Sequence, residues 1–227
     1  MVDQRKENYH YEEALKTLRT NIQFAGAEIT SILVTSCYPN EGKSDIVSQL
    51  AKEMGKAGKK VLLLDADIRK SAFIQRFQIE GEVKGLSQYL SGQVAVRDIL
   101  YTTNYENVDI IFAGPVAPNP SELLEGKLFA HLVEGLSQRY DYILIDTPPM
   151  ASVIDAAIVG GVCDGAILVI EDGTVGYRTA QKVKAQLEKS GSRVLGAVLN
   201  KVEMKKGKYY SYDKYGKYSK YGRYGKY

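Results

Sequence analysis

A short loop, residues 36–44, constrains the fold most, because it lies between an apolar run and a helical pattern that begins near Ser44. A strand, a loop of backbone amides and a helix N-terminus, in that order, form a common cradle for phosphate groups. Gly42 lets the backbone approach a phosphate closely, Lys43 can reach the β- and γ-phosphates, and the Ser44 hydroxyl can hold magnesium. The pattern Gly-x-x-x-x-Gly-Lys-Ser/Thr is incomplete, since Cys37 stands where the first Gly belongs. The loop alone therefore leaves nucleotide binding open.

The size and composition of the chain favour one soluble α/β domain. Its 227 residues, 44% hydrophobic and 25% charged, are enough to build a substantial core. No run of about 18 apolar residues occurs, so we expect no membrane span, and the polar N-terminus does not resemble a signal peptide. Two cysteines, Cys37 and Cys163, offer neither a disulfide framework nor a metal-ligand pair, which favours a reducing cytoplasm.

Apolar runs that predict strands alternate with helical patterns along most of the chain. Strands are expected at 31–35, 60–65, 108–112, 142–146, 165–170 and 193–199. Helices are expected at 9–24, 44–57, 70–78, 85–91, 94–101, 121–139 and 174–190, with Ser121 as the cap of the sixth. This alternation predicts right-handed βαβ units and one parallel sheet covered on both faces. Because ligands of such sheets bind beyond the carboxyl ends of the strands, we expect one site there.

Three aspartates follow or end predicted strands. Asp65 and Asp67 are two residues apart, so in an extended chain both carboxylates project from one face. Carboxylates so close repel each other, and a divalent cation relieves that repulsion. Asp146 lies roughly a hundred residues after the loop, a usual place for a carboxylate that orients magnesium through water. Each Asp alone could merely cap a helix or face solvent, but the three together with the loop favour a magnesium–nucleotide site.

The last part of the chain, residues 203–227, differs in composition from the rest. It contains eight tyrosines that alternate with Lys, Gly and Ser, at Tyr209, Tyr210, Tyr212, Tyr215, Tyr218, Tyr221, Tyr224 and Tyr227. Its eight basic residues against Glu203 and Asp213 give it a charge of +6, which leaves −3 for the remainder of a chain whose total is +3. No aliphatic side chain is available for a core, so we predict a disordered basic tail. We accordingly divide the chain into a helical segment 1–30, a P-loop domain 31–202 and the tail.

Taken in order, these motifs resemble the Walker A, A′ and B set of the bacterial tyrosine kinases (BY-kinases). The resemblance rests on residues 36–44, 63–69 and 143–149, and extends to the loop at 114–124 and the terminal tyrosines. In the first helix, Glu13, Lys16 and Arg19 are similar to the family's E-x-x-R-x-x-R oligomerisation motif. The family implies a single P-loop NTPase domain of the MinD/ParA-like kind with a parallel sheet. The lack of membrane spans resembles the stand-alone cytoplasmic kinases of Gram-positive capsule and exopolysaccharide operons.

The resemblance implies an ATP- and Mg²⁺-dependent protein-tyrosine kinase that autophosphorylates its C-terminal tyrosine cluster between subunits. Catalytic roles fall on Lys43, Asp65, Asp67 and Asp146, with Asp65 placed to accept the proton of the incoming tyrosine. The implied magnesium ligands are Ser44, Asp67 and Asp146, the last through water. The residues implied to bind nucleotide are Asn40, Glu41, Gly42, Lys43, Ser44, Asp45 and Asn200.

The family also implies partners and a location. We expect a homo-oligomeric ring, taken to be an octamer, that assembles through Glu13, Lys16 and Arg19. A membrane activator with a cytoplasmic C-terminal segment and a cognate tyrosine phosphatase are expected partners, and nucleic acid is not. The chain is expected in the cytoplasm, at the inner face of the membrane, where it regulates capsular or exopolysaccharide synthesis and export.

Three positions depart from the family pattern. Asn40 replaces a usual Gly, although Asn tolerates positive φ better than most residues. Asp45 stands where Thr is common; its charge opposes the α-phosphate but suits a helix N-terminus. Lys16 replaces an Arg, which keeps the charge and loses the bidentate fork.

Two other functions remain open from the sequence. A ParA/MinD-type ATPase shares the fold and the Walker arrangement, but such loops carry an additional early lysine, where this chain has Cys37 and Tyr38. A binding module could instead use the Tyr/Lys tail to hold nucleic acid or an anionic membrane. The strict recurrence of tyrosine beside a kinase-like site favours the kinase over both.

Overall fold

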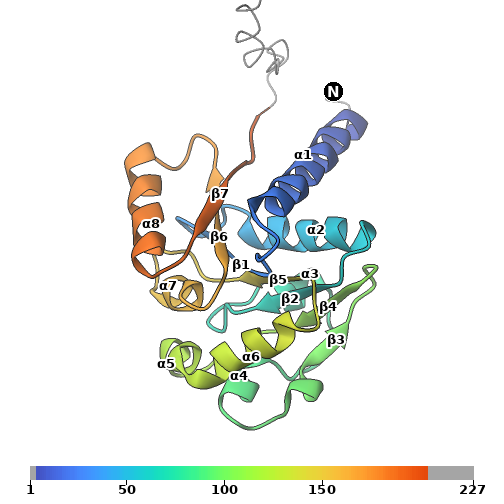
Figure 1. Cartoon of the computed structure of the whole chain (residues 1–227), viewed down its shortest axis with the longest axis vertical. Helices are drawn as coiled ribbons and strands as arrows, with labels where there is room; N and C mark the ends of the chain where they lie inside the picture. The colour runs from blue at the N-terminus through green and yellow to red at the C-terminus, as the bar shows by residue number, and fades with distance from the viewer. Residues whose placement is uncertain (1–3, 204–227) are drawn as a thin grey trace, which may run out of the picture.

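The computed structural model describes residues 4–203 of the chain, which form one seven-stranded sheet with helices on both faces (Figure 1). The strands are β1 (Ser31–Ser36), β2 (Val61–Asp65), β3 (Leu100–Thr102), β4 (Val108–Ile111), β5 (Tyr142–Asp146), β6 (Gly165–Glu171) and β7 (Val194–Asn200). Their order in the sheet is β3-β4-β2-β5-β1-β6-β7. All neighbours are parallel except β3 and β4.

The helices, in chain order, include several short ones. They are α1 (Gln4–Ala25), α2 (Lys43–Lys56), α3 (Phe73–Arg76), α4 (Leu86–Leu90), the 3₁₀ helix η1 (Val96–Asp98), α5 (Pro120–Glu125), α6 (Lys127–Ser137), α7 (Asp155–Gly160) and α8 (Tyr177–Lys189). Figure 1 shows α1 and α2 on one side of the sheet and α4, α5 and α6 on the other.

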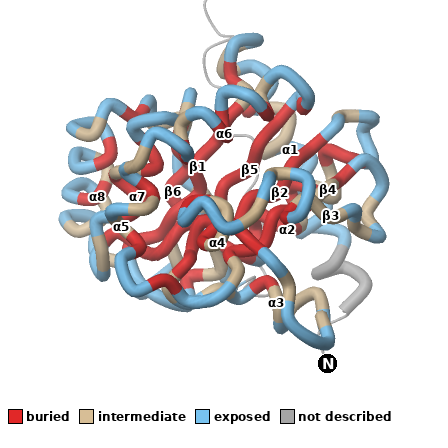
Figure 2. The backbone as a smooth tube through the Cα atoms, turned by 90° about the horizontal axis from the view of Figure 1, so that it is seen from below, coloured by how far each residue is buried: buried red, intermediate tan, exposed pale blue. Residues whose placement is uncertain are grey.

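Each central strand supplies side chains to both faces, because successive residues of a strand point in opposite directions. In β2, Leu62 and Leu64 pack with α4 to α8, whereas Val61 and Leu63 pack with α1, α2 and α3. Figure 2 shows the result, a buried central sheet enclosed by half-buried and exposed helices. The nearly continuous apolar runs of the sequence are therefore strands buried on both sides.

The predicted P-loop α/β fold is confirmed, but the sheet is not wholly parallel. The helix predicted over 94–101 is instead η1 followed by β3, an edge strand antiparallel to β4. The aromatic and β-branched residues Tyr101 and Thr102 favour a strand. Asn107, with a φ of 58°, lies in the turn that reverses the chain before β4.

Three helical predictions need correction. The helix expected over 121–139 is divided at Gly126, whose extended ψ of 151° ends α5 and begins α6. Ser121 is not its cap: α5 begins one residue earlier, at Pro120, with Asn119 at the N-cap position. Helix α7 was not predicted, and α1 begins five residues before the predicted start at 9.

The other end of the chain lies largely outside this description. Of the predicted tail, only Glu203 falls within the described residues, and all eight terminal tyrosines lie beyond them. Within residues 4–203, no helix combines the length and the apolar character needed to cross a membrane.

Candidate active site

The sheet order brings three motifs that are distant in sequence to the same edge. β5 lies between β2 and β1, so the ends of all three strands are neighbours. In the register, Asp146 is opposite Asp65 on one side and Val34, near the end of β1, on the other. Parallel strands lie about 4.8 Å apart, so the loop after β1 and the two aspartates meet at one place. The site expected beyond the carboxyl ends of the strands is therefore formed.

The phosphate loop owes its shape to two residues in the left-handed region. Asn40 has a φ of 66° and Gly42 a φ of 89°. Asn adopts this region more readily than most residues, so its place in the loop keeps the turn. Gly42 is needed for a second reason, since a Cβ there would lie 2.2 Å from Nδ2 of Asn200. The buried Glu41 carboxylate accepts the Cys37 N–H at 2.8 Å and braces the loop from inside.

Two residues at the end of β7 fasten the loop from outside. Asn200 Nδ2 donates to the Glu41 carbonyl at 2.9 Å. Lys201 Nζ donates to the Asn40 carbonyl at 2.6 Å and pairs with Glu171 Oε2 at 3.0 Å. Asn200 thus lies against the phosphate loop, a contact that the sequence did not predict, and its predicted contact with adenine stays a prediction. The role of Lys201 was not predicted.

Lys43 and Ser44 face the carboxylate that ends β5. The Ser44 hydroxyl donates to Asp146 Oδ2 at 2.5 Å. Lys43 Nζ donates to Ser44 Oγ at 3.0 Å, and lies 3.4 Å from Asp146 Oδ2 and 3.9 Å from Asp67 Oδ2. The other Asp146 oxygen, Oδ1, is buried and has no hydrogen-bond partner among the described residues. One ammonium thus holds two carboxylates of the site, with an oxygen left over.

The three aspartates share a poorly hydrated environment. Asp65 is fully buried and accepts hydrogen bonds from the Ser71 hydroxyl and, at 3.2 Å, from the Asp67 N–H. Burial, followed by the charge of Asp146, raises the pKa of Asp65 to about 8. Burial is also the largest cause that raises the pKa of Asp67 and of Asp146. Such a cluster of carboxyl groups is costly to ionise unless a cation joins it.

The donor atoms fit magnesium bound together with phosphates. Within residues 4–203, no group of three or more His, Cys, Asp or Glu side chains is arranged to hold a metal alone. Magnesium in nucleotide sites typically needs only one or two carboxylates, because phosphates and water complete its shell. The unpartnered Asp146 Oδ1, the Ser44 hydroxyl and the Asp67 carboxylate are hard oxygen donors of the kind that such a site requires, and their role as magnesium ligands stays a prediction.

The charge of Asp45 is balanced by a partner that the sequence did not indicate. Asp45 is exposed in the first turn of α2, and its carboxylate pairs with the guanidinium of Arg76 at the end of α3. A neutralised carboxylate repels a nearby phosphate much less than a free one. The opposition expected between Asp45 and the α-phosphate is thereby reduced.

Comparison with known proteins places the chain in a family. A family model described as an AAA domain matches residues 40–189. The tyrosine-protein kinase CpsD of Streptococcus agalactiae is 42% identical over 201 residues, which cover 88% of each chain. The chain belongs to the bacterial tyrosine kinases. The resemblance found in the motifs is confirmed.

Solved structures agree with this assignment to the BY-kinases. The kinase domain of the Escherichia coli tyrosine kinase ETK superposes with a TM-score of 0.82 at 34% identity, covering 88% of this chain and 79% of that one. The septum site-determining protein MinD of Pyrococcus horikoshii, solved with Mg-ADP, gives a TM-score of 0.66 at 26% identity, covering 75% and 70%. The MinD-like P-loop fold is thus confirmed as well.

This BY-kinase chain holds a further buried carboxylate, Asp155, that sequence reasoning missed. Asp155 accepts two hydrogen bonds from Arg69, from Nε at 2.6 Å and from Nη2 at 3.0 Å. The Ser121 hydroxyl donates to the same carboxylate at 2.7 Å. Arg69 ends the segment that carries Asp67, so the pair ties that segment to α5 and α7. The only sequence signal was an Asp without an assigned role before an apolar stretch.

The oligomerisation motif of the BY-kinase chain lies on α1, and its contacts are within the chain. Lys16 Nζ pairs with Glu13 at 2.8 Å along the helix. Arg19 Nη1 reaches Glu53 of α2 at 3.1 Å. The structure does not bring these three residues to the phosphate loop. Their role in an interface stays a prediction.

Proposed function

We propose that this chain is an ATP-dependent protein-tyrosine kinase that phosphorylates the tyrosines of its own C-terminal tail, between subunits. The proposal rests chiefly on one observation: the phosphate loop and three aspartates converge at one edge of the sheet. Family membership and the eight terminal tyrosines support it. The tail supplies the acceptor, and the edge of the sheet supplies the groups that phosphoryl transfer requires.

In the proposed reaction, the tyrosine oxygen attacks the γ-phosphorus of ATP, the bond to the bridging β-oxygen breaks, and ADP leaves. Lys43 and the loop amides stabilise the charge on the transferring group. Asp65 takes the phenolic proton in its ionised form. A pKa raised to about 8 makes that carboxylate a stronger base than an exposed one, but leaves it in the minority at neutral pH in the free chain. When bound, magnesium supplies the positive charge that neutralises the phosphates, held by Ser44, Asp67 and Asp146.

The charge of the tail gives the proposed reaction a regulatory consequence. Each phosphate adds about −1.5 to −2, so eight would add roughly −12 to −16 to a tail that starts at +6. A basic tail is attracted to an acidic, nucleotide-loaded site on a neighbouring subunit, and a phosphorylated tail is repelled. Autophosphorylation would thereby favour disassembly of the ring.

The proposed context follows from the family resemblance. The ring assembles through Glu13, Lys16 and Arg19, and a membrane activator brings the kinase to the inner face of the membrane through its cytoplasmic C-terminal segment. A cognate phosphatase reverses the modification. Cycles of phosphorylation then regulate capsular or exopolysaccharide synthesis and export.

The test is incubation of the full chain with magnesium and ATP, with and without the activator segment, followed by mapping of phosphorylated residues. Phosphotyrosine should appear within 209–227. Lys43→Met and Asp67→Asn should each abolish the signal, whereas Lys59→Met, which removes an exposed ammonium outside the site, should not. Deletion of residues 204–227 should remove most phosphotyrosine and change the oligomeric state. Phosphate on serine instead of tyrosine would contradict the proposal.

The related ATPase function is separable by the same assay. Cys37 and Tyr38 occupy the part of the loop where MinD-like ATPases carry their additional lysine. ATP hydrolysis without phosphotyrosine would favour that function. Salt-sensitive binding of nucleic acid without phosphotyrosine would favour a binding module.

A further inference from the structure

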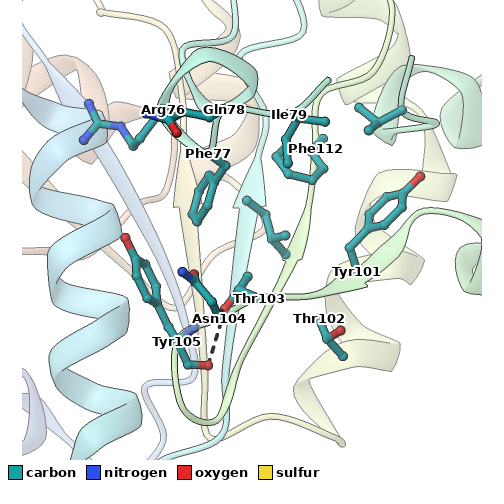
Figure 3. Close-up of a pocket in the computed structure, with 12 residues that line it drawn as sticks. Arg76, Phe77, Gln78, Ile79, Tyr101, Thr102, Thr103, Asn104, Tyr105 and Phe112 are labelled. Carbon is teal, nitrogen blue, oxygen red and sulfur yellow. Dashed lines mark hydrogen bonds between the residues drawn. The ribbon is translucent and has the colours of Figure 1, made fainter. Parts of the chain in front are cut away.

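A pocket of about 510 Å³ lies beside the candidate active site, between the segment that follows α3 and the hairpin of β3 and β4 (Figure 3). This volume is within the usual range for ligand pockets, about 300–1,000 Å³. Four of its twelve lining residues are aromatic, and none of the residues assigned to nucleotide or magnesium lines it. We call it the aromatic pocket and define it by Phe77, Tyr101, Tyr105 and Phe112.

The four rings of the aromatic pocket contact one another in succession, from Tyr105 through Phe77 and Phe112 to Tyr101. Ring centroids are 5.7 Å apart for Phe77 and Tyr105, 6.1 Å for Phe77 and Phe112, and 5.6 Å for Tyr101 and Phe112. Figure 3 shows Phe77 and Tyr105 on one side of the pocket and Tyr101 on the other. These distances match favourable aromatic pairs, so a further ring entering the pocket would meet edges and faces at suitable spacing.

The aromatic pocket also offers contacts for a phenol and an ammonium. Gln78 and Asn104 line it with amide groups that can hydrogen-bond to a hydroxyl. Lys52 Nζ already lies 5.3 Å from the centroid of Tyr105, which shows that a ring of this cluster accepts a cation. A segment that contains both tyrosine and lysine would use both kinds of contact.

The aromatic pocket is connected to the phosphate loop through Arg76 and Asp45. Arg76 lines its rim and pairs with Asp45, the residue that follows Ser44. Phe112, on the opposite wall, directly follows the carboxyl end of β4, at the same edge of the sheet as Asp65. One end of the pocket therefore lies at the edge of the sheet where a phosphate acceptor must stand, and the pocket extends from there towards Tyr105, ahead of β4.

We propose that the aromatic pocket binds one tyrosine of the C-terminal tail while another tyrosine of the same tail occupies the active site. This inference rests on the proposed kinase function. From Tyr212 the tyrosines recur every three residues, and three extended residues span about 10 Å. Docking of one ring thus sets a ring one or two repeats away about 10 or 20 Å further along an extended tail. Phe112 of the pocket follows the strand paired with β2, the strand that ends at Asp65.

Charge and length support the tail as the occupant. Once the Arg76–Asp45 pair is set aside, the surroundings of the aromatic pocket carry the exposed Glu80, Glu82 and Glu106 against Lys84 and Lys52, a net charge of −1. Residues 212–227 carry five basic side chains against one acidic.

The tail continues from β7, at the opposite end of the sheet from β3, roughly 29 Å away at about 4.8 Å per strand. Its 24 residues span up to roughly 80 Å when extended, so length permits the contact.

The test compares two full chains in which Tyr218 is the only tail tyrosine. In one, the other seven tail tyrosines are replaced by Phe, which keeps the rings without the acceptor; in the other they are replaced by Ala. We expect the initial rate of Tyr218 phosphorylation to be about 5- to 10-fold higher with Phe, since each aromatic contact contributes about 1 kcal/mol.

The pocket is then blocked in both chains. Asn104→Trp fills it from an exposed position, and Phe77→Leu removes one ring while keeping an apolar side chain. Both should reduce the ratio between the Phe and Ala chains towards one, with nucleotide affinity unchanged. Gln186→Trp, at an exposed position of α8, is the matched control and should leave the ratio intact.

Three outcomes would overturn the inference. The first is equal rates for the Phe and Ala chains. The second is a ratio that neither pocket variant changes. The third is equal slowing of both chains by Asn104→Trp together with a change of mass in light scattering, which would make the pocket an interface between folded copies. Failure of the kinase function itself is distinguishable, because then no chain would carry phosphate on Tyr218.

Discussion

Asp146 and Asp155 are two buried carboxylates that have similar partners but differ in how many of their oxygens accept a hydrogen bond. Each accepts a hydrogen bond from a serine hydroxyl, of Ser44 and Ser121 respectively, and each has a basic side chain within reach. Both oxygens of Asp155 are satisfied. Asp146 Oδ1 is buried without a partner among residues 4–203.

The difference follows from the two cations. The guanidinium of Arg69 is a planar fork that matches both carboxylate oxygens, whereas the ammonium of Lys43 is a single point of charge shared by two aspartates. A satisfied carboxylate locks elements together. A carboxylate with an oxygen left over is prepared to bind something else. We therefore interpret the first arrangement as structural and propose the second as a ligand site.

The largest effect is expected for Asp146, the carboxylate with an oxygen that has no hydrogen-bond partner among residues 4–203. Asp146→Asn keeps the shape and the acceptor for Ser44 but removes the charge that magnesium requires. We expect tyrosine phosphorylation to fall by about 10²- to 10³-fold, the usual loss for one electrostatic contact to the reacting group. Stability in urea should stay equal or rise, because a buried charge is removed. A variant that lost stability and kept activity would reverse the assignment.

Asp155, whose two oxygens both accept hydrogen bonds, should respond in the opposite way, with a loss of stability. Asp155→Asn leaves Arg69 without its bidentate partner, and we expect a loss of up to about 3 kcal/mol in the free energy of unfolding, the lower end for a broken buried pair. The lower end applies because the Arg69 side chain is 36% exposed and can turn to water. Urea unfolding measures the loss, and Ser121→Ala should show a smaller one. Unchanged stability for Asp155→Asn would show that the pair is not structural.

The pH dependence of stability tests the buried carboxyl group of Asp65. In the folded chain the pKa of Asp65 is about 8, against an ordinary value of 3.8. The native state then keeps a proton that the unfolded state has lost, so stability should fall as pH rises from about 4 to 8. The slope for one proton is at most about 1.4 kcal/mol per pH unit. Unfolding measured without magnesium or nucleotide should show this fall, and Asp65→Asn should reduce it; an equal slope in that variant would contradict the pKa.

The smallest effect concerns an exposed pair, Asp45 and Arg76. Exposed pairs contribute about 0.2–1 kcal/mol, so Arg76→Gln should weaken nucleotide binding by only about 2- to 5-fold, by freeing the Asp45 charge. The double variant Asp45→Thr/Arg76→Gln should recover the lost affinity. Nucleotide titration of all four chains measures the coupling. Independent effects of the two changes would show that Arg76 does not neutralise Asp45.

The comparison also shows which features the sequence could predict. Lys43, Ser44 and Asp146 belong to motifs with local signatures, each at the end of an apolar strand, and the rule for parallel sheets places such ends together. Asp155 is 86 residues from Arg69 and belongs to a short helix without strong periodicity. No local pattern connects the two, because their pairing depends on how α5 and α7 pack.

The errors in the fold have similar causes. The residues of β3 satisfy a helical pattern in isolation, and only pairing with β4 decides for a strand. The break at Gly126 depends on one extended residue within an otherwise continuous helical pattern. The aromatic pocket is formed by segments whose apolar residues were assigned to separate elements. In each case tertiary contacts override a local preference.

Finally, the hydrogen bonds from Asn200 and Lys201 to the phosphate loop connect the nucleotide site with the segment that leads into the tail. These residues lie at the end of β7, just before the tail, and they grip the carbonyls of Glu41 and Asn40. Thermodynamic linkage is reciprocal: if nucleotide tightens this grip, any partner that pulls on the tail and loosens it must weaken nucleotide binding by the same factor. A phosphatase or activator that engages the tail would then act on nucleotide exchange without touching the nucleotide.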